Sequence, residues 1–178
     1  MTKKILLTII LFVLFFQSMQ FIMAEEKNLH YQKGMNYLEE DDYTNAMSEF
    51  MLFLKENPNS SRGHNNLGFC YYKVGNLGIA EKEYRNAVEL DPDYALAYNN
   101  LGIIAYKMKN YEKAASYYKK AIEINPLYAK AMVNLGVIYW KMGNKKMAKD
   151  MYERAKNVDE RYVKERIANR RKNENTKE

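Results

Sequence analysis

Two histidines are the side chains in this sequence best suited to bind a metal or to transfer a proton. His30 and His64 begin a series that continues at equal intervals with Tyr98 and Met132. Because an aromatic and an apolar residue continue the series, we interpret the histidines as packing residues rather than metal ligands or general bases. The series also indicates that the chain repeats a unit of fixed length.

The other reactive groups form no catalytic arrangement either. Cys70 is the only cysteine, which excludes an intramolecular disulfide, and no base stands beside it, so we expect it to pack between helices. The acidic run 39–42 lacks the glycine and the alternating oxygen ligands of a calcium loop. Its residues nearest Tyr43 are placed to cap a following helix. We therefore predict no enzymatic activity, no metal and no cofactor.

The interval that separates the two histidines recurs in three further residue types. The series are Gly34, Gly68, Gly102 and Gly136; Ala46, Ala80, Ala114 and Ala148; and Pro58, Pro92 and Pro126. Three independent series with one period predict an array of stacked repeats. In such an array each unit contacts only its neighbours, which suits a chain of 178 residues.

One copy of the unit, residues 95–128, indicates what it folds into. Small and apolar residues recur at helical spacing on both sides of a polar break at 109–110, which predicts two amphipathic helices that face each other. Pro126 disfavours helical backbone at the residue before it, so the second helix should end at Asn125. We expect Asn125 to cap the next helix, with Pro126 in its first turn.

The other copies vary at the breaks. Gly75-Asn76 and Gly143-Asn144 occupy the corresponding break of two copies, and such pairs readily adopt positive φ. Glu160 stands where a fourth proline is expected, while Asp159 keeps the cap position before it. A further helix can therefore begin at about residue 160.

The unit resembles the tetratricopeptide repeat, a helical hairpin of about 34 residues. The residues that carry the resemblance in one copy are Leu67, Gly68, Tyr71, Ala80, Tyr84, Ala87 and Pro92. The resemblance implies an all-α fold, namely a right-handed α-solenoid of four hairpins with a C-terminal capping helix. We expect hairpins over 27–60, 61–94, 95–128 and 129–162, the capping helix over 160–172 and a disordered tail over 173–178.

In the family that this sequence resembles, the first helix of each hairpin lines a concave groove that holds extended peptides. Carried over by position, the groove residues are Arg62, Asn65, Asn66, Phe69, Tyr72, Lys73, Leu96, Asn99, Asn100, Ile103, Tyr106, Lys107, Lys130, Val133, Asn134, Val137, Trp140 and Lys141. An asparagine amide can donate to and accept from a peptide backbone, rings supply apolar contact, and lysines favour acidic partners. The alternative is that the asparagines only join neighbouring helices.

The two ends of the chain differ from the repeats in composition. The net charge is +6, yet basic and acidic residues balance over 25–160, and the excess lies in residues 1–4 and 161–178. Lys3 and Lys4 precede an uncharged apolar run, 5–16, which is typical of an export signal. Cleavage after Ala24 and an uncleaved signal-anchor over 5–24 both remain open. We predict export across the cytoplasmic membrane to a periplasmic or extracytoplasmic site, either secreted or anchored.

Together these patterns predict a non-enzymatic interaction scaffold of the cell envelope that binds an extended peptide or partner protein, with no small-molecule substrate. An alternative is that the basic segment 161–172 and the tail bind an anionic surface and the repeats act as a spacer. Membrane headgroups fit this alternative better than nucleic acid, because the chain is predicted to be exported. Self-association through the exposed face of an end repeat is a third possibility.

Overall fold

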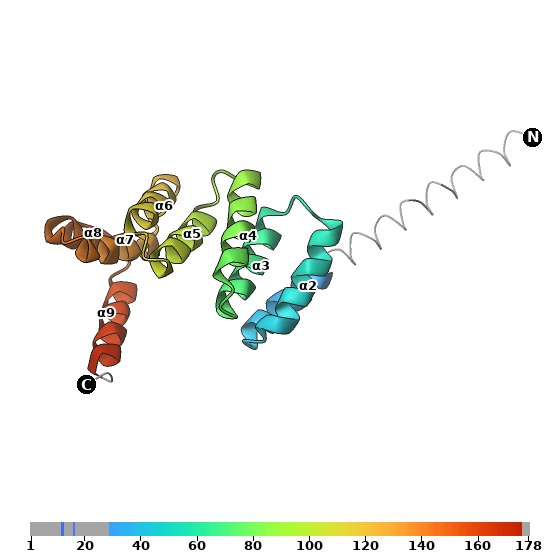
Figure 1. Cartoon of the computed structure of the whole chain (residues 1–178), viewed down its shortest axis with the longest axis horizontal. Helices are drawn as coiled ribbons and strands as arrows, with labels where there is room; N and C mark the ends of the chain where they lie inside the picture. Colours follow the sequence, from blue (N-terminus) through green and yellow to red (C-terminus); the bar gives the residue numbers. More distant parts are fainter. Residues whose placement is uncertain (1–11, 13–15, 17–28, 176–178) are drawn as a thin grey trace, which may run out of the picture.

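The computed structural model describes residues 12, 16 and 29–175, and this part of the chain contains helices and no strands. The helices are 29–39, α2 (Tyr43–Glu56), α3 (Ser61–Lys73), α4 (Leu77–Leu90), α5 (Ala95–Lys107), α6 (Tyr111–Ile124), α7 (Ala129–Lys141), α8 (Lys145–Val158) and α9 (Glu160–Asn175). Figure 1 shows them as pairs that follow one another along the molecule. The predicted all-α solenoid is confirmed.

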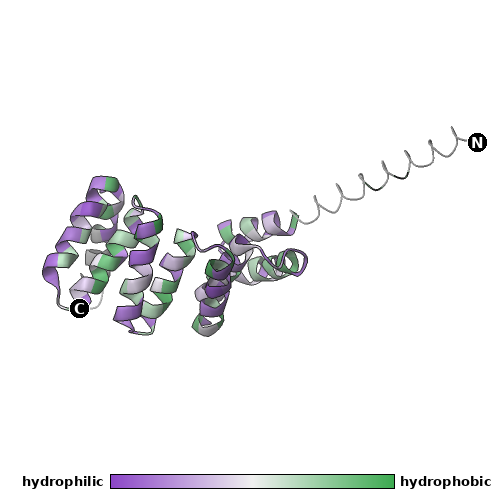
Figure 2. Cartoon of the chain, turned by 90° about the horizontal axis from the view of Figure 1, so that it is seen from above, coloured by the Kyte–Doolittle hydropathy of each residue, from purple (hydrophilic) through white to green (hydrophobic). Residues whose placement is uncertain are grey.

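Each hairpin consists of an A helix followed by a B helix. The A helices are 29–39, α3, α5 and α7, and the B helices are α2, α4, α6 and α8. Helices that are consecutive in the chain pack against each other. In Figure 2 hydrophobic and hydrophilic stretches alternate along the helices, as expected when each helix buries one face.

The predicted export segment, residues 1–24, lies outside the described residues except for Phe12 and Phe16, which are helical and exposed. In the part of the chain that the structure describes, no helix is both long enough and apolar enough to cross a bilayer. Export and anchoring remain predictions from the sequence.

The turns between A and B helices share one backbone geometry. The residues with positive φ are Asp41 (56°), Gly75 (86°), Lys109 (61°) and Gly143 (78°). The prediction for the two glycines is confirmed. Asp41 and Lys109 adopt the same left-handed conformation, although their Cβ atoms make it sterically unfavourable. The residue that follows caps the B helix by accepting a hydrogen bond from a backbone N–H: Asp42, Asn76, Asn110 and Asn144.

The connection between hairpins differs from the sequence prediction. Asn125 is the C-cap of α6 and does not cap α7, which begins at Ala129 after Tyr128. The Asn125 side chain accepts a hydrogen bond from the N–H of Leu127 at 3.0 Å, so the asparagine and proline form a turn before the helix instead of starting it. Asp159 does act as predicted: it accepts from the N–H of Tyr162 at 2.9 Å, and α9 begins directly after it.

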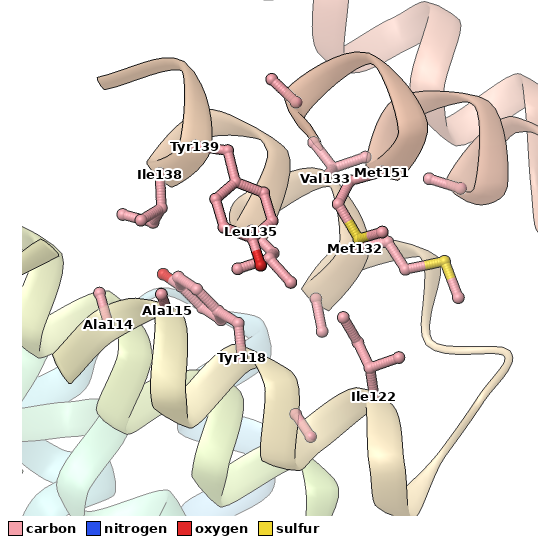
Figure 3. Packing of buried hydrophobic residues seen from close by; sticks show 14 of the residues in the cluster. Ala114, Ala115, Tyr118, Ile122, Met132, Val133, Leu135, Ile138, Tyr139 and Met151 are labelled. Atoms are coloured by element: carbon pink, nitrogen blue, oxygen red, sulfur yellow. The ribbon is translucent and has the colours of Figure 1, made fainter. Parts of the chain in front are cut away.

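The core lies between the helices of each hairpin and between neighbouring hairpins. Figure 3 shows one such region, where Tyr118 and Ile122 of α6 lie against α7, which contributes Leu135 and Met132. The periodic glycines of the A helices allow rings of the B helices to approach closely: a Cβ on Gly102 would lie 2.5 Å from Cε1 of Tyr118. The nearest ring atom would lie at 2.8 Å for Gly34 and 2.9 Å for Gly68, so glycine is a packing requirement in the first three hairpins.

Helix α9 packs on the end of the array through a narrow apolar edge. Val163 is buried and Tyr162 is half-buried, and the helix contacts α8 and α7. It extends to Asn175, beyond the predicted end at 172, and residues 176–178 lie outside the described part. Arg161 pairs with Glu165 at 2.9 Å and Lys164 with Glu160 at 3.0 Å, so acidic neighbours offset part of the basic charge proposed to bind an anionic surface.

Candidate functional site

The A helices carry the side chains that the sequence predicts to contact a partner. These side chains recur at the repeat period as amides, rings and basic groups. Equivalent positions of stacked helices lie on the same side of an array, and we call the surface that these positions form the A-helix face. The structure decides which of its side chains are accessible.

Asparagines form a chain of hydrogen bonds beneath the A-helix face. Asn134 Nδ2 donates to Asn99 Oδ1 at 3.0 Å, which joins α7 to α5. Asn99 Nδ2 donates to the neighbouring Asn100 Oδ1 at 3.4 Å, and Asn100 Nδ2 donates to Asn65 Oδ1 at 2.9 Å, which joins α5 to α3. All donors point in one direction along the array.

The chain continues to the first hairpin. Asn65 Nδ2 donates to Asn66 Oδ1 at 3.4 Å, and Asn66 Nδ2 donates to the Tyr31 hydroxyl at 3.1 Å, which joins α3 to the helix over 29–39. The four A helices are thus connected by hydrogen bonds between asparagine amides and, at the first hairpin, the Tyr31 hydroxyl.

Burial separates these amides from any partner. Asn65 is 2 % exposed, Asn99 0 % and Asn100 8 %, and their amides already bond to each other. For these three residues the structure favours the alternative that the sequence left open, in which asparagine joins neighbouring helices. Asn66 and Asn134 are half-buried and keep part of their side chains at the surface.

The rings and apolar side chains of the A-helix face are accessible. Phe69, Ile103 and Val137 are half-buried at equivalent positions of α3, α5 and α7. Tyr72 and Tyr106 are half-buried and Trp140 is 49 % exposed one helical turn further on. Of the remaining predicted positions, Leu96 is exposed and Val133 is buried in the core. An apolar strip therefore runs across three hairpins.

Basic side chains border this strip. Arg62, Lys73, Lys107, Lys130 and Lys141 are all exposed, and within the described residues none of them forms an ion pair with a carboxylate. Partial desolvation lowers the pKa of Lys130, and the nearby positive charge of Arg166 from α9 lowers it further. Two cations that approach each other at the C-terminal end of the face favour an acidic partner there.

The two histidines pair with glutamates that the sequence analysis did not single out. His30 Nδ1 lies 2.6 Å from Glu49 Oε2, and His64 Nδ1 lies 2.6 Å from Glu83 Oε2. The Nε2 atom of His64 lies 2.9 Å from the Pro58 carbonyl oxygen. The glutamates repeat at the same interval as the histidines, a regularity that could have identified them. The histidines thus join A and B helices by polar contacts as well as by packing.

The His64 pair makes stability depend on pH. Its hydrogen bond with Glu83 raises the pKa of His64 against the effect of burial, and the Pro58 carbonyl adds to the increase. A raised pKa means that the stabilisation is complete below the ordinary value of 6.5 and is lost as pH rises through the folded-state value. We expect the difference in urea midpoint between the native protein and His64→Gln to be larger at about pH 6 than at about pH 8. A difference independent of pH would contradict this assignment.

Neither Cys70 nor the acidic run 39–42 has the surroundings of a reactive thiol or a metal site. Cys70 is 0 % exposed, and burial raises the pKa of its thiol to about 12, so the reactive thiolate is disfavoured. Asp42 caps α2 through the N–H of Asn45 at 3.0 Å, as predicted. Among the described residues no three metal-binding side chains come together.

Comparisons with known proteins agree with this architecture. Three sequence profiles, each described as a tetratricopeptide repeat, match residues 59–126, 105–164 and 28–60. A search of curated protein sequences found no match.

Solved structures with the same arrangement of helices include a crystal structure of MamA, which is 28 % identical with a TM-score of 0.64 and covers 71 % of this chain and 74 % of that chain. The pilF protein of Pseudomonas aeruginosa is 26 % identical with a TM-score of 0.71 and covers 77 % of this chain and 63 % of that chain. The first tetratricopeptide repeat domain of Spaghetti (RPAP3), bound to the HSP90 peptide SRMEEVD, is 21 % identical with a TM-score of 0.64 and covers 67 % and 94 %.

The profiles together span residues 28–164, which include every hairpin of the structure. The repeat period, the antiparallel helix pairs and the glycine-to-ring contacts all fall in this span. The chain therefore belongs to the tetratricopeptide repeat family.

Proposed function

We propose that the chain is a non-enzymatic scaffold of the cell envelope that binds an extended peptide or a segment of a partner protein along its A-helix face. The observation that carries the proposal is the strip of accessible rings on three successive A helices, bordered by basic side chains that have no carboxylate partner in the described residues. Tetratricopeptide repeat domains generally mediate interactions between proteins. The RPAP3 domain, which shares the fold, holds an acidic peptide.

In this proposal the rings and the cations bind the partner, and the amides support them. The buried amides of Asn65, Asn99 and Asn100 satisfy one another and are not available to a peptide backbone. They join neighbouring A helices, which carry Tyr72, Tyr106 and Trp140 at equivalent positions. Large rings with few rotatable bonds give contact area at low entropic cost. The lysines beside them give a preference for acidic segments.

The envelope location rests on the sequence of residues 1–24, with two lysines followed by an uncharged apolar run. If this segment is cleaved, the scaffold is secreted; if it is kept, residues 5–24 hold the array at the membrane surface. In both cases the partner is a protein with an extended segment outside the cytoplasm.

Partner capture from envelope extracts tests the proposal, with the native protein compared with Tyr106→Ala. We expect Tyr106→Ala to reduce the captured partner at least about tenfold, the loss typical of a residue that dominates an interface. Leu90→Ala is a matched control, because Leu90 is 40 % exposed on the B helix α4, and it should capture the partner as well as the native protein does.

The same experiment separates the alternative function. Binding that is lost on deleting residues 161–178, falls steeply with salt and is unaffected by Tyr106→Ala would show that the basic C-terminal segment binds an anionic surface. Equal loss in Tyr106→Ala and Leu90→Ala would contradict the assignment of the A-helix face.

A further inference from the structure

Exposed apolar side chains gather at the turns between A and B helices. Val74, Met108 and Met142 are the C-caps of α3, α5 and α7, and their exposed fractions are 48 %, 48 % and 44 %. They occupy one position of the repeat in three successive hairpins. A sparse scatter of exposed apolar residues is ordinary, but a repeated position in stacked hairpins places these side chains in one row along the same edge.

The fourth turn adds further apolar surface. Trp140 is 49 % exposed and Met147, in the first turn of α8, is 40 % exposed. The Lys145 ammonium lies 5.8 Å from the centre of the Trp140 ring, so the side chains on the two sides of this turn come together. We call residues 106–113 and 140–147 the third and fourth tips.

The charge of the tips changes along the array. The equivalent first tip, residues 38–45, carries the acidic run 39–42, whereas the fourth tip has Lys141, Lys145 and Lys146 and no acidic residue. The third tip has the exposed residues Lys107, Lys109 and Glu112, together with Lys113, which pairs with Glu81 at 2.9 Å. In the described residues the other lysines of the third and fourth tips form no ion pair. The positive charge at this end is therefore available to an external anion.

The third and fourth tips are neighbours in space. Helix α7 packs against α6, and the bond from Asn134 to Asn99 ties α7 to α5. Because every hairpin turns at the same end of its helices, the two tips lie next to each other at one edge of the array. Methionines, a tryptophan and lysines are thus combined at one edge.

We propose that the third and fourth tips dock on an anionic lipid surface, with Met108, Trp140, Met142 and Met147 in the interfacial layer and the lysines against the headgroups. The composition favours lipid over a protein partner. Segments that lie in the membrane interface combine lysines with a tryptophan and other large apolar side chains. The acidic first tip is repelled by the same surface, which fixes the orientation of the array.

This inference goes beyond the peptide-binding function and rests mainly on residues outside the A-helix face. Met142, Met147, Lys145 and Lys146 are not among the side chains proposed to hold a peptide. Docking at the tips would hold the array against the membrane and leave most of the A-helix face open. Four residues, Tyr106, Lys107, Trp140 and Lys141, belong to both surfaces, so the test below changes other residues.

Trp140 is the only tryptophan of the chain, so its fluorescence reports on the fourth tip alone. The test mixes the full-length protein with phosphatidylcholine vesicles that either contain or lack phosphatidylglycerol. We expect a blue shift of Trp140 emission, and quenching by lipids brominated on the acyl chains, only with phosphatidylglycerol. Both signals should fall as salt is added.

Lys145→Gln/Lys146→Gln tests the headgroup contacts. About fivefold in vesicle affinity is expected for each lysine, and so on the order of 25-fold for the pair. Lys33→Gln/Lys55→Gln is a matched control, because both lysines are exposed in the first hairpin, and it should bind as the native protein does. All variants keep the same residues 1–24, so differences between them come from the tips.

Met142→Ser/Met147→Ser tests the apolar contacts. This variant should give a smaller blue shift of Trp140 emission and less quenching by brominated lipid. Capture of the peptide partner should stay unchanged. The proposal is overturned if anionic vesicles leave Trp140 emission unchanged or if neutral vesicles give the same shift. It is also overturned if Lys33→Gln/Lys55→Gln loses as much affinity as Lys145→Gln/Lys146→Gln. A shift that appears only on addition of a protein partner would assign the tips to protein binding and equally reject lipid docking.

Discussion

Replacing Asn100 with alanine is expected to destabilise the protein by about 2–5 kcal/mol, although the side chain removed is polar. Asn100 is 8 % exposed, and it is the middle member of the amide chain. Its loss leaves the Asn65 oxygen without the donor that lies 2.9 Å away and the Asn99 amide without its acceptor at 3.4 Å. A buried polar group without a partner costs about 1–3 kcal/mol. The midpoint of urea unfolding, monitored by circular dichroism, measures the effect.

Asn134→Ala is the matched control at the end of the chain. Asn134 is half-buried and donates one hydrogen bond, to Asn99 at 3.0 Å, so its removal leaves one buried acceptor unpaired and should cost about 1 kcal/mol. Equal losses for the two variants would mean that the amides act singly and not as a chain. A loss below that of the control for Asn100→Ala would refute the assigned hydrogen bonds.

The expected loss of stability makes Asn100→Ala unsuitable as a test of peptide binding. We expect Asn100→Ala to lower binding by loosening the contact between α3 and α5, even if the partner does not contact Asn100. A ring substitution such as Tyr106→Ala removes contact surface without cutting the amide chain. Binding and stability should therefore be measured on the same variants.

The hairpins were predictable from the sequence because their determinants are local and repeated. Gly102 has one packing reason to be glycine, the approach of Tyr118, and the same reason recurs at Gly34 and Gly68. The predicted cap at Asp159 was found for a similar reason, since a carboxylate directly before a helix has one preferred hydrogen bond. Lys109 adopts positive φ against its own preference, because stacking fixes the turn.

The role of each amide could not be predicted. An asparagine on an A helix can bond to a partner or to the next A helix, and the sequence pattern is identical in both cases. The difference is the burial of Asn65, Asn99 and Asn100, which depends on how closely the helices approach. The cap expected at Asn125 was wrong for a related reason: asparagine before proline serves a turn as well as a helix start.

The partners of the histidines were missed because they lie 19 residues away on another helix. Residues at equal positions of different repeats reveal the period, whereas a contact between the two helices of one hairpin joins unequal positions. A search for residue pairs that repeat together would have found His30 with Glu49 and His64 with Glu83.

Gly102→Ala is expected to destabilise the protein by about 2–3 kcal/mol, even though alanine favours helices over glycine by about 1 kcal/mol. The added Cβ would lie 2.5 Å from Cε1 and 2.7 Å from Cδ1 of Tyr118. The Tyr118 ring is 2 % exposed and packed between α5, α6 and α7, so it cannot move aside without displacing other core side chains. The steric cost should outweigh the gain in helix propensity.

Gly136→Ala is the matched substitution one repeat further on. There the Cβ would lie 3.2 Å from Cε2 of Tyr152, and this ring is half-buried at the end of the array, where a shift of a few tenths of an ångström meets less resistance. We expect Gly136→Ala to change the urea midpoint little or to raise it slightly, because propensity and contact nearly cancel. Replacing Tyr118 by leucine in the Gly102→Ala background should recover part of the loss, since the ring atoms that clash are removed. Equal destabilisation by the two alanines, or no recovery with leucine, would show that the glycine series reflects something other than ring contact.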